Sequence, residues 1–184
     1  MLTHETFIQQ MEKLVSFQTT PDNSQALTNC LSYLHSLVPK EAYSEIIRAD
    51  VSPILLAGST KTLTPDVLFL AHADVVEGTD SQFVAQKRGD LLIGRGASDM
   101  KFSLPLGIAL LRDQFASDRK TSVMLAVTTD EETGGFQGAA YLASEYGLQT
   151  KVIIVLDGGN NFRLIQSSKG VIVLTLLSQG KPTH

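Results

Sequence analysis

The sequence predicts an α/β fold, a three-layer α/β/α sandwich built around a mainly parallel sheet. Short apolar runs bounded by Gly, Pro or Asp alternate along the chain with segments whose apolar residues recur at helical spacing. Apolar runs without polar alternation are typical of strands buried on both faces of a parallel sheet. The chain has 184 residues, 43% of them hydrophobic, which is enough for one substantial core.

The expected elements begin with two helices, and the second helix has Asp22 and Ser24 as candidate caps. They are, in order, helices over 7–15 and 27–34, strands over 52–58 and 66–71, a hairpin turning at Gly89 and Asp90, a helix over 104–115, a strand over 122–129, a helix over 135–147 and a strand over 151–157. A further apolar strand, "VIVLTLL", begins at Val171, and the sequence stops soon after it, so we expect a truncated chain.

The composition argues against several classes of protein. A net charge of −4 without a long basic run predicts no nucleic-acid partner. No stretch approaches the roughly 18 apolar residues of a membrane span, and the amino terminus lacks the apolar core of a signal peptide. The single cysteine, Cys30, lies in an apolar helical stripe and is expected to be a buried reduced thiol. We therefore expect a cytoplasmic protein.

Acidic residues and a histidine follow several of the predicted strands. Each has an ordinary structural explanation: a hydrogen-bonded pair for His72 and Asp74, a surface ion pair of Asp99 with Lys101, or a solvated turn. In a parallel sheet, however, they would share one edge, where ligands bind. The residues are His72, Asp74, Asp99, Asp130, Glu131, Glu132 and Asp157.

A histidine with several carboxylates is a ligand set for a divalent metal, and for zinc in particular. Two neighbouring metal ions need one carboxylate that bridges them, and a carboxylate left free of metal can activate a water molecule. Glu131 and Glu132 supply both possibilities, because adjacent residues in a loop can point in different directions.

The motifs "FLAHADVV", "GRGASDMK", "TTDEETGG", "LDGG" and "GKPTH", in this order, resemble the family of co-catalytic zinc amidohydrolases that contains acetylornithine deacetylase, succinyl-diaminopimelate desuccinylase, aminoacylase and the glutamate carboxypeptidases. The resemblance implies two Zn²⁺ per subunit, with Co²⁺ as a substitute. It also implies that His72 binds one zinc ion, Asp99 bridges both, Glu132 binds the second and Asp157 completes the first.

The same resemblance assigns the remaining roles. Asp74 would orient the His72 ring, and Glu131 would be the general base that takes a proton from the metal-bridging water and delivers it to the leaving amine. His184 would reach across a dimer and stabilise the oxyanion. The peptide bond after Asp99 would be cis. Two features depart from the family pattern: Phe102 stands where a glycine is common, and the aromatic-proline segment before the second motif is reduced.

By this resemblance, residues 1–168 form the amino-terminal part of the catalytic domain, and residues 169–184 begin a lid and dimerisation domain whose remainder is absent. The intact protein would be a homodimer through that lid. The isolated chain, without the lid and the last histidine ligand of the family, would bind zinc poorly and be inactive.

The expected function is metal-dependent hydrolysis of an amide bond in N-acyl amino acids or small peptides. A zinc aminopeptidase of related architecture and a non-catalytic metal-binding remnant are the alternatives. A nucleotide-binding domain is disfavoured, because "GRGASD" lacks the spacing of a dinucleotide-binding loop and no P-loop Gly-Lys-Ser or Gly-Lys-Thr occurs.

Overall fold

A twisted sheet organises the chain in the computed structural model, which describes residues 2–48, 51–117, 120–157, 167 and 174–180. The described residues form a five-stranded sheet. In spatial order its strands are β1 (Tyr43–Ile47), β2 (Ile54–Gly58), β6 (Val123–Thr128), β3 (Val67–His72) and β7 (Val152–Val155).

The strand directions confirm a mainly parallel sheet. Strand β3 runs parallel to both β6 and β7, whereas β2 is antiparallel to its neighbours β1 and β6. The carboxyl ends of β6, β3 and β7 therefore share one edge. The predicted hairpin is also present, with β4 (Gln86–Arg88) and β5 (Leu91–Ile93) paired in a separate two-stranded sheet.

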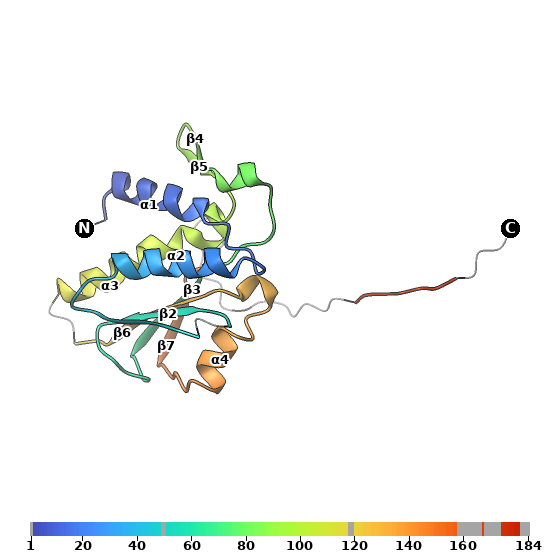
Figure 1. The fold of residues 1–184 in the computed structure, drawn as a ribbon. Helices are drawn as coiled ribbons and strands as arrows, with labels where there is room; N and C mark the ends of the chain where they lie inside the picture. Colours follow the sequence, from blue (N-terminus) through green and yellow to red (C-terminus); the bar gives the residue numbers. More distant parts are fainter. Residues whose placement is uncertain (1, 49–50, 118–119, 158–166, 168–173, 181–184) are drawn as a thin grey trace.

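Helices cover both faces of the sheet, as expected for three layers. Helices α1 (His4–Ser16), α2 (Ser24–Leu37) and α3 (Ser103–Phe115) lie on one face, and α4 (Ala139–Ser144) lies on the other (Figure 1). Short helical turns complete the described secondary structure. They are η1 (Asp80–Phe83), η2 (Ala97–Lys101) and η3 (Glu131–Thr133).

The strands alternate their side chains between two apolar clusters. Leu55, Leu125 and Val127 are completely buried in the larger cluster, beneath α1, α2 and α3. Their sequence neighbours Ile54 and Met124 belong to a second cluster, which Leu142 of α4 covers from the opposite face. Buried strands thus bring apolar residues to both faces, which explains their continuous apolar runs.

Two sequence expectations need correction. The cap of α2 is Asn23, whose side chain accepts a hydrogen bond from the Ala26 N–H at 3.1 Å, rather than Asp22 or Ser24. The helix expected over 135–147 is reduced to α4, because Gly134 and Gly135 adopt positive φ angles and hold the preceding residues in a turn.

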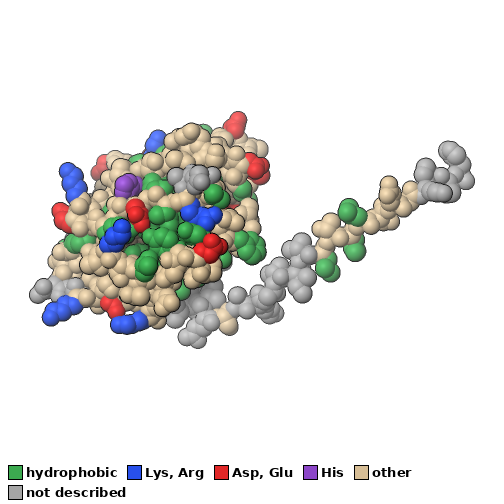
Figure 2. All heavy atoms as spheres, turned by 60° about the horizontal axis from the view of Figure 1, so that its bottom comes forward, with side chains coloured by type: hydrophobic (Ala, Val, Ile, Leu, Met, Phe, Trp, Pro, Cys, Tyr) green, Lys and Arg blue, Asp and Glu red, His purple; other side chains and the backbone are tan. Residues whose placement is uncertain are grey.

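The described part of the carboxyl-terminal segment, 174–180, has no helix or strand. Leu174, Leu176 and Leu177 are almost completely exposed, and this segment extends away from the globular part of the protein (Figure 2). Residues 171–173, where the expected strand begins, lie outside the described residues, and so does His184. The division into domains at residue 168 stays a prediction. No helix in the described part of the chain is long and apolar enough to cross a membrane.

Candidate metal centre

His72 is the last residue of β3 and lies at the carboxyl edge of the sheet. Its side chain is only 2% exposed. Its Nδ1 atom lies 3.0 Å from the carbonyl oxygen of Asp74 and 3.4 Å from Asp74 Oδ1. A proton on Nδ1 would be held toward Asp74, which leaves the Nε2 lone pair free on the open side of the ring.

Asp74 is completely buried and connects two loops of the site. Its Oδ2 atom accepts a hydrogen bond from the Glu132 N–H at 2.9 Å, while Oδ1 has no hydrogen-bond partner. The same carboxylate therefore lies against the His72 ring and fixes the start of the turn η3. A buried carboxylate oxygen facing Nδ1 is suited to orient a metal-binding imidazole.

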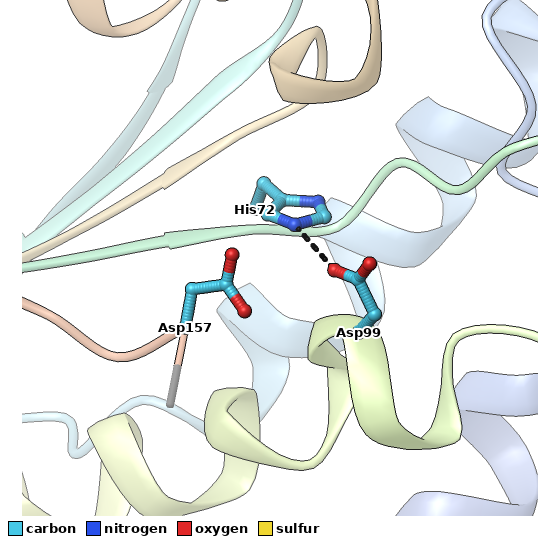
Figure 3. Close-up of side chains that lie close together, drawn as sticks. All are labelled: His72, Asp99 and Asp157. Atoms are coloured by element: carbon cyan, nitrogen blue, oxygen red, sulfur yellow. Dashed lines mark hydrogen bonds and ion pairs between the residues drawn. The ribbon is translucent and has the colours of Figure 1, made fainter. Parts of the chain in front are cut away.

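Asp99 does not follow a strand of the sheet, contrary to the expectation that all the acids lie at strand ends. It comes from η2, the turn before α3, and reaches the carboxyl edge from outside the sheet (Figure 3). Its Oδ1 atom lies 3.2 Å from His72 Nε2, and its side chain is 66% exposed. The Asp99–Met100 peptide bond is cis, as expected.

Asp157 completes a group of three converging side chains. It lies two residues beyond β7, at the same edge as His72, and is exposed. Each of the three residues, His72, Asp99 and Asp157, offers one potential ligand atom, and these three atoms lie within 4.8 Å of one another (Figure 3). These three residues are the group that could hold a metal ion among the described residues. A small cavity of about 60 Å³, lined in part by Leu70 and Val155, adjoins this group.

The two glutamates of η3 have different surroundings. Glu131 Oε2 lies 3.8 Å from His72 Nε2, and the Glu131 side chain is 56% exposed. Glu132 is half-buried and does not belong to the converging group, although its backbone N–H binds Asp74. The structure thus places the Glu131 carboxylate beside Nε2 of the His72 ring. The role of Glu132 as a ligand stays a prediction, and His184 lies outside the described residues.

The carboxylates dominate the electrostatics of the site. Burial disfavours the charged imidazole, but the hydrogen bond and charge of Asp74, together with the charge of Glu131, raise the pKa of His72 to about 9. Burial raises the pKa of Glu131; nearby His72 opposes this rise, and the charges of Asp74, Asp157 and Asp99 add to it. Several carboxylates crowded around one imidazole favour occupation by a cation.

Lys101 is a residue that the sequence interpretation misjudged. Instead of forming a surface ion pair with Asp99, its side chain is completely buried, and its Nζ donates hydrogen bonds to the carbonyls of Leu14 and Phe17. No feature of "SDMK" signals this, because the acceptors are backbone atoms more than 80 residues away in the sequence.

Asp130 has a structural function within its loop. It is buried, and its Oδ2 atom accepts a hydrogen bond from the Gln137 N–H at 2.7 Å. A Cβ atom at Gly138 would lie 2.1 Å from Asp130 Oδ1, so the loop closes tightly around this carboxylate. Asp130 therefore shapes the turn that presents Glu131.

A mainly parallel sheet with an imidazole and carboxylates at its carboxyl edge defines an α/β domain with a candidate metal site. The chain belongs to Peptidase family M20/M25/M40, whose family model matches residues 68–173, more than half of the sequence. This confirms the resemblance found in the sequence.

Individual relatives agree with this assignment. The chain is 30% identical over 150 residues to a succinyl-diaminopimelate desuccinylase of Vesicomyosocius okutanii, covering 72% of this chain and 36% of the relative. It is 28% identical over 120 residues to the [LysW]-lysine/[LysW]-ornithine hydrolase of Saccharolobus solfataricus, covering 65% of this chain and 32% of the relative. The chain spans between about a quarter and a third of the length of the curated relatives it matches.

A solved structure shows the same fold. The M20 family metallo-carboxypeptidase Sso-CP2 from Sulfolobus solfataricus superimposes with a TM-score of 0.63 at 17% sequence identity, over 83% of this chain and 37% of that protein. At this identity the likeness concerns the fold alone.

Proposed function

We propose that this chain carries the metal-binding core of a hydrolase that cleaves amide bonds in N-acyl amino acids or small peptides. The observation that carries the proposal is the convergence of His72, Asp99 and Asp157 at one edge of the sheet, with Glu131 beside them. The names of the relatives, a succinyl-diaminopimelate desuccinylase and a [LysW]-lysine/[LysW]-ornithine hydrolase, support an acylated amino group as the substrate.

The donor set fits zinc, and Co²⁺ would substitute for it. One imidazole nitrogen and carboxylate oxygens are the ligands that Zn²⁺ takes in catalytic sites. Asp74 fits this assignment, because its buried Oδ1 lies 3.4 Å from Nδ1 and would keep Nε2 available for the metal. For a pair of zinc ions, Asp99 would supply the shared carboxylate and Glu132 would hold the second ion.

Glu131 would act as the general base. A bound zinc pair lowers the pKa of water and polarises a carbonyl group. Glu131 would accept the proton of the attacking water and pass it to the nitrogen of the leaving amine, so that the amide C–N bond breaks without releasing an amide anion. The raised pKa of Glu131 suits a group that both accepts and donates a proton.

The motif "GKPTH" supports a further part of the proposal. It is consistent with residues 169–184 opening a lid domain, with a homodimer formed through that lid, and with His184 completing the site of a partner subunit. Substrate choice would then depend on residues contributed by the lid.

The test combines metal titration of the intact protein with hydrolysis assays on N-succinyl and N-acetyl amino acids and on dipeptides. We expect zinc-dependent turnover, and we expect His72→Ala to lose both metal and activity. Absence of zinc binding by the unaltered protein would contradict the proposal. Zinc binding without turnover of any of these substrates would instead favour a non-catalytic metal-binding module.

A further inference from the structure

The segment that joins α1 to α2 contacts the loop that follows His72. Thr19 is completely buried in this segment, and its Oγ1 atom donates a hydrogen bond to the Ala73 carbonyl at 2.6 Å. The Val75 N–H donates in turn to the Thr19 carbonyl at 3.0 Å. Because Ala73 and Val75 flank Asp74, these two bonds fix the backbone of the loop that directly follows His72 and carries the buried carboxylate.

Lys101 attaches the same segment to the turn that carries Asp99. Its Nζ atom donates to the Leu14 carbonyl at 3.0 Å and to the Phe17 carbonyl at 2.7 Å, at the carboxyl end of α1. Each carbonyl also accepts one backbone N–H, Leu14 from Phe17 at 3.2 Å and Phe17 from Thr19 at 2.9 Å, and a cation at a helix carboxyl terminus is favourable. The side chain has little room to move, since a Cβ atom at Gly96 would lie 3.0 Å from Lys101 Cδ.

The segment 17–19 is therefore anchored to both donor-bearing loops, once through Thr19 and once through Lys101. Building on the proposed function, we propose that Lys101 is a positioning residue for the metal centre. Together with Thr19 it sets the separation of His72 and Asp99. Lys101 does not touch the metal, and it acts through the backbone of η2, whose Met100 sulfur also accepts a hydrogen bond from the His72 N–H at 3.2 Å.

Electrostatics and positioning predict opposite effects when Lys101 is neutralised. A buried ammonium whose charge interacts with Asp74 repels a metal cation bound at His72, so its removal alone would tighten metal binding. Loss of the anchor would instead let Asp99 move relative to His72 and weaken binding. Whether metal affinity rises or falls on substitution of Lys101 therefore distinguishes the electrostatic effect from the positioning effect.

The central experiment is Lys101→Met, which retains an unbranched apolar side chain and removes the donors. We expect the dissociation constant for Zn²⁺ to rise by roughly tenfold or more, as when groups that orient metal ligands are removed. We also expect an altered d–d absorption spectrum of the Co²⁺-substituted protein. Unchanged or tighter metal binding, with an unchanged spectrum, would overturn the proposal.

A second pair of variants decides the question if Lys101→Met does not fold. Thr19→Val removes the hydroxyl donor at nearly constant volume, and Thr19→Ser keeps it. We expect Thr19→Val to weaken Zn²⁺ binding and Thr19→Ser to retain most of the affinity. If Lys101→Met does fold, the losses in the combined Lys101→Met and Thr19→Val variant should be less than additive, because either change alone releases the segment. Equal affinity of the two Thr19 variants would contradict the proposed role.

Tyr146→Phe is the matched control. It removes a hydrogen bond of 2.9 Å from the Tyr146 hydroxyl to Glu45, within the cluster on the opposite face of the sheet. We expect it to lower thermal stability without changing Zn²⁺ affinity or the Co²⁺ spectrum. All variants are made in the intact protein, and failure of the unaltered intact protein to bind metal would refute the proposed function itself. Metal binding that is equal in the unaltered protein, Lys101→Met and Tyr146→Phe would refute only the role of Lys101.

Discussion

Glu131 and Glu132 are adjacent carboxylates with different environments. Glu131 faces the His72 ring at 3.8 Å and is mostly exposed, whereas Glu132 is half-buried and its backbone N–H binds Asp74. Burial raises the pKa of each residue, and for Glu132 the charge of Asp99 is the next contribution. The two residues are therefore suited to different roles.

Glutamine substitutions should separate these roles. Glu131→Gln should retain metal and lose roughly 10²–10⁴-fold in turnover, because the base is removed while the donors remain. Glu132→Gln should weaken metal binding itself. Zinc titration and steady-state kinetics of each variant provide the measurement, with Glu12→Gln at an exposed position of α1 as the control. Equal loss of metal in both variants would mean that the roles are wrongly assigned.

Asp74 should matter for metal affinity although it is not expected to bind the metal. Asp74→Asn removes the charge that faces Nδ1 of His72, so we expect Zn²⁺ to bind roughly 10–100-fold more weakly. Calorimetric titration measures this change, and Asp90→Asn in the exposed turn of the hairpin is the control. Unchanged affinity in Asp74→Asn would show that the backbone carbonyl of Asp74 suffices to orient the ring.

The position of His72, Asp74 and Asp157 at one edge could be predicted because each lies at or just after the end of a recognisable apolar strand, and the direction of a parallel strand determines the edge at which its end lies. The sequence did not identify the burial of Lys101. Its partners are carbonyl groups at the end of a distant helix, and every residue type offers the same carbonyl, so local sequence carries no signal for the contact.

At the level of elements, Asp66 joins the starts of three parallel strands. Its carboxylate accepts hydrogen bonds from the N–H and Oγ of Ser122, both at 2.9 Å, and from Lys151 Nζ at 2.6 Å. Asp66 precedes β3, Ser122 precedes β6 and Lys151 precedes β7. The hydrogen bond of Lys151, followed by those of Ser122, holds the pKa of Asp66 well below its ordinary value.

This depressed pKa predicts an acid-sensitive contribution to stability. The folded protein binds a proton at Asp66 less readily than the unfolded chain, so the contribution is complete above the unfolded pKa of about 4 and is lost as the pH falls below it. Asp66→Asn should therefore flatten the fall in unfolding free energy below about pH 4, as measured by urea denaturation. Asp22→Asn, at an exposed turn, should leave that dependence unchanged, and the same curve for both variants would contradict the assignment.

The turn η2 shows why element boundaries limit prediction. The sequence located the hairpin and the helix over 104–115, yet Asp99 between them was assigned to a strand end. Its backbone angles, with φ −134° and ψ 97°, interrupt the helical turn. The shape of such a turn depends on what packs against it, here the buried Met100 and Lys101, rather than on the periodicity of its residues.

For the whole molecule, stability depends on the cluster between the sheet and the three helices. Leu125 of β6 is completely buried there, and α3 approaches it so closely that a Cβ atom at Gly107 would lie 2.9 Å from Leu125 Cδ1. Every residue of β6 is buried, and its side chains alternate between the two apolar clusters, which explains how the sequence predicted both the strand and the two-sided covering of the sheet. The antiparallel direction of β2 was not predictable, because an apolar run does not encode its direction.

Leu125→Ala should lower the unfolding free energy by about 2–5 kcal/mol, because it leaves a cavity in a packed core. Leu91→Ala in the hairpin, where the residue is 66% exposed, should change it by less than about 0.5 kcal/mol. Urea denaturation followed by circular dichroism compares the two variants. A similar decrease in unfolding free energy for Leu125→Ala and Leu91→Ala would contradict the assignment of Leu125 to the core.

The strand order β1-β2-β6-β3-β7 has a consequence for how the protein is made. Strand β6 lies between β2 and β3 in the sheet but is translated after both strands. His72 and Asp157 are about 85 positions apart in the sequence. At about 5–20 residues per second, a ribosome needs roughly 4–17 s to extend the chain from the histidine to the last aspartate. During that interval the nascent chain has only part of its donor set. On the proposed function, the domain would capture metal only after Asp157 has been translated and β7 has joined the sheet.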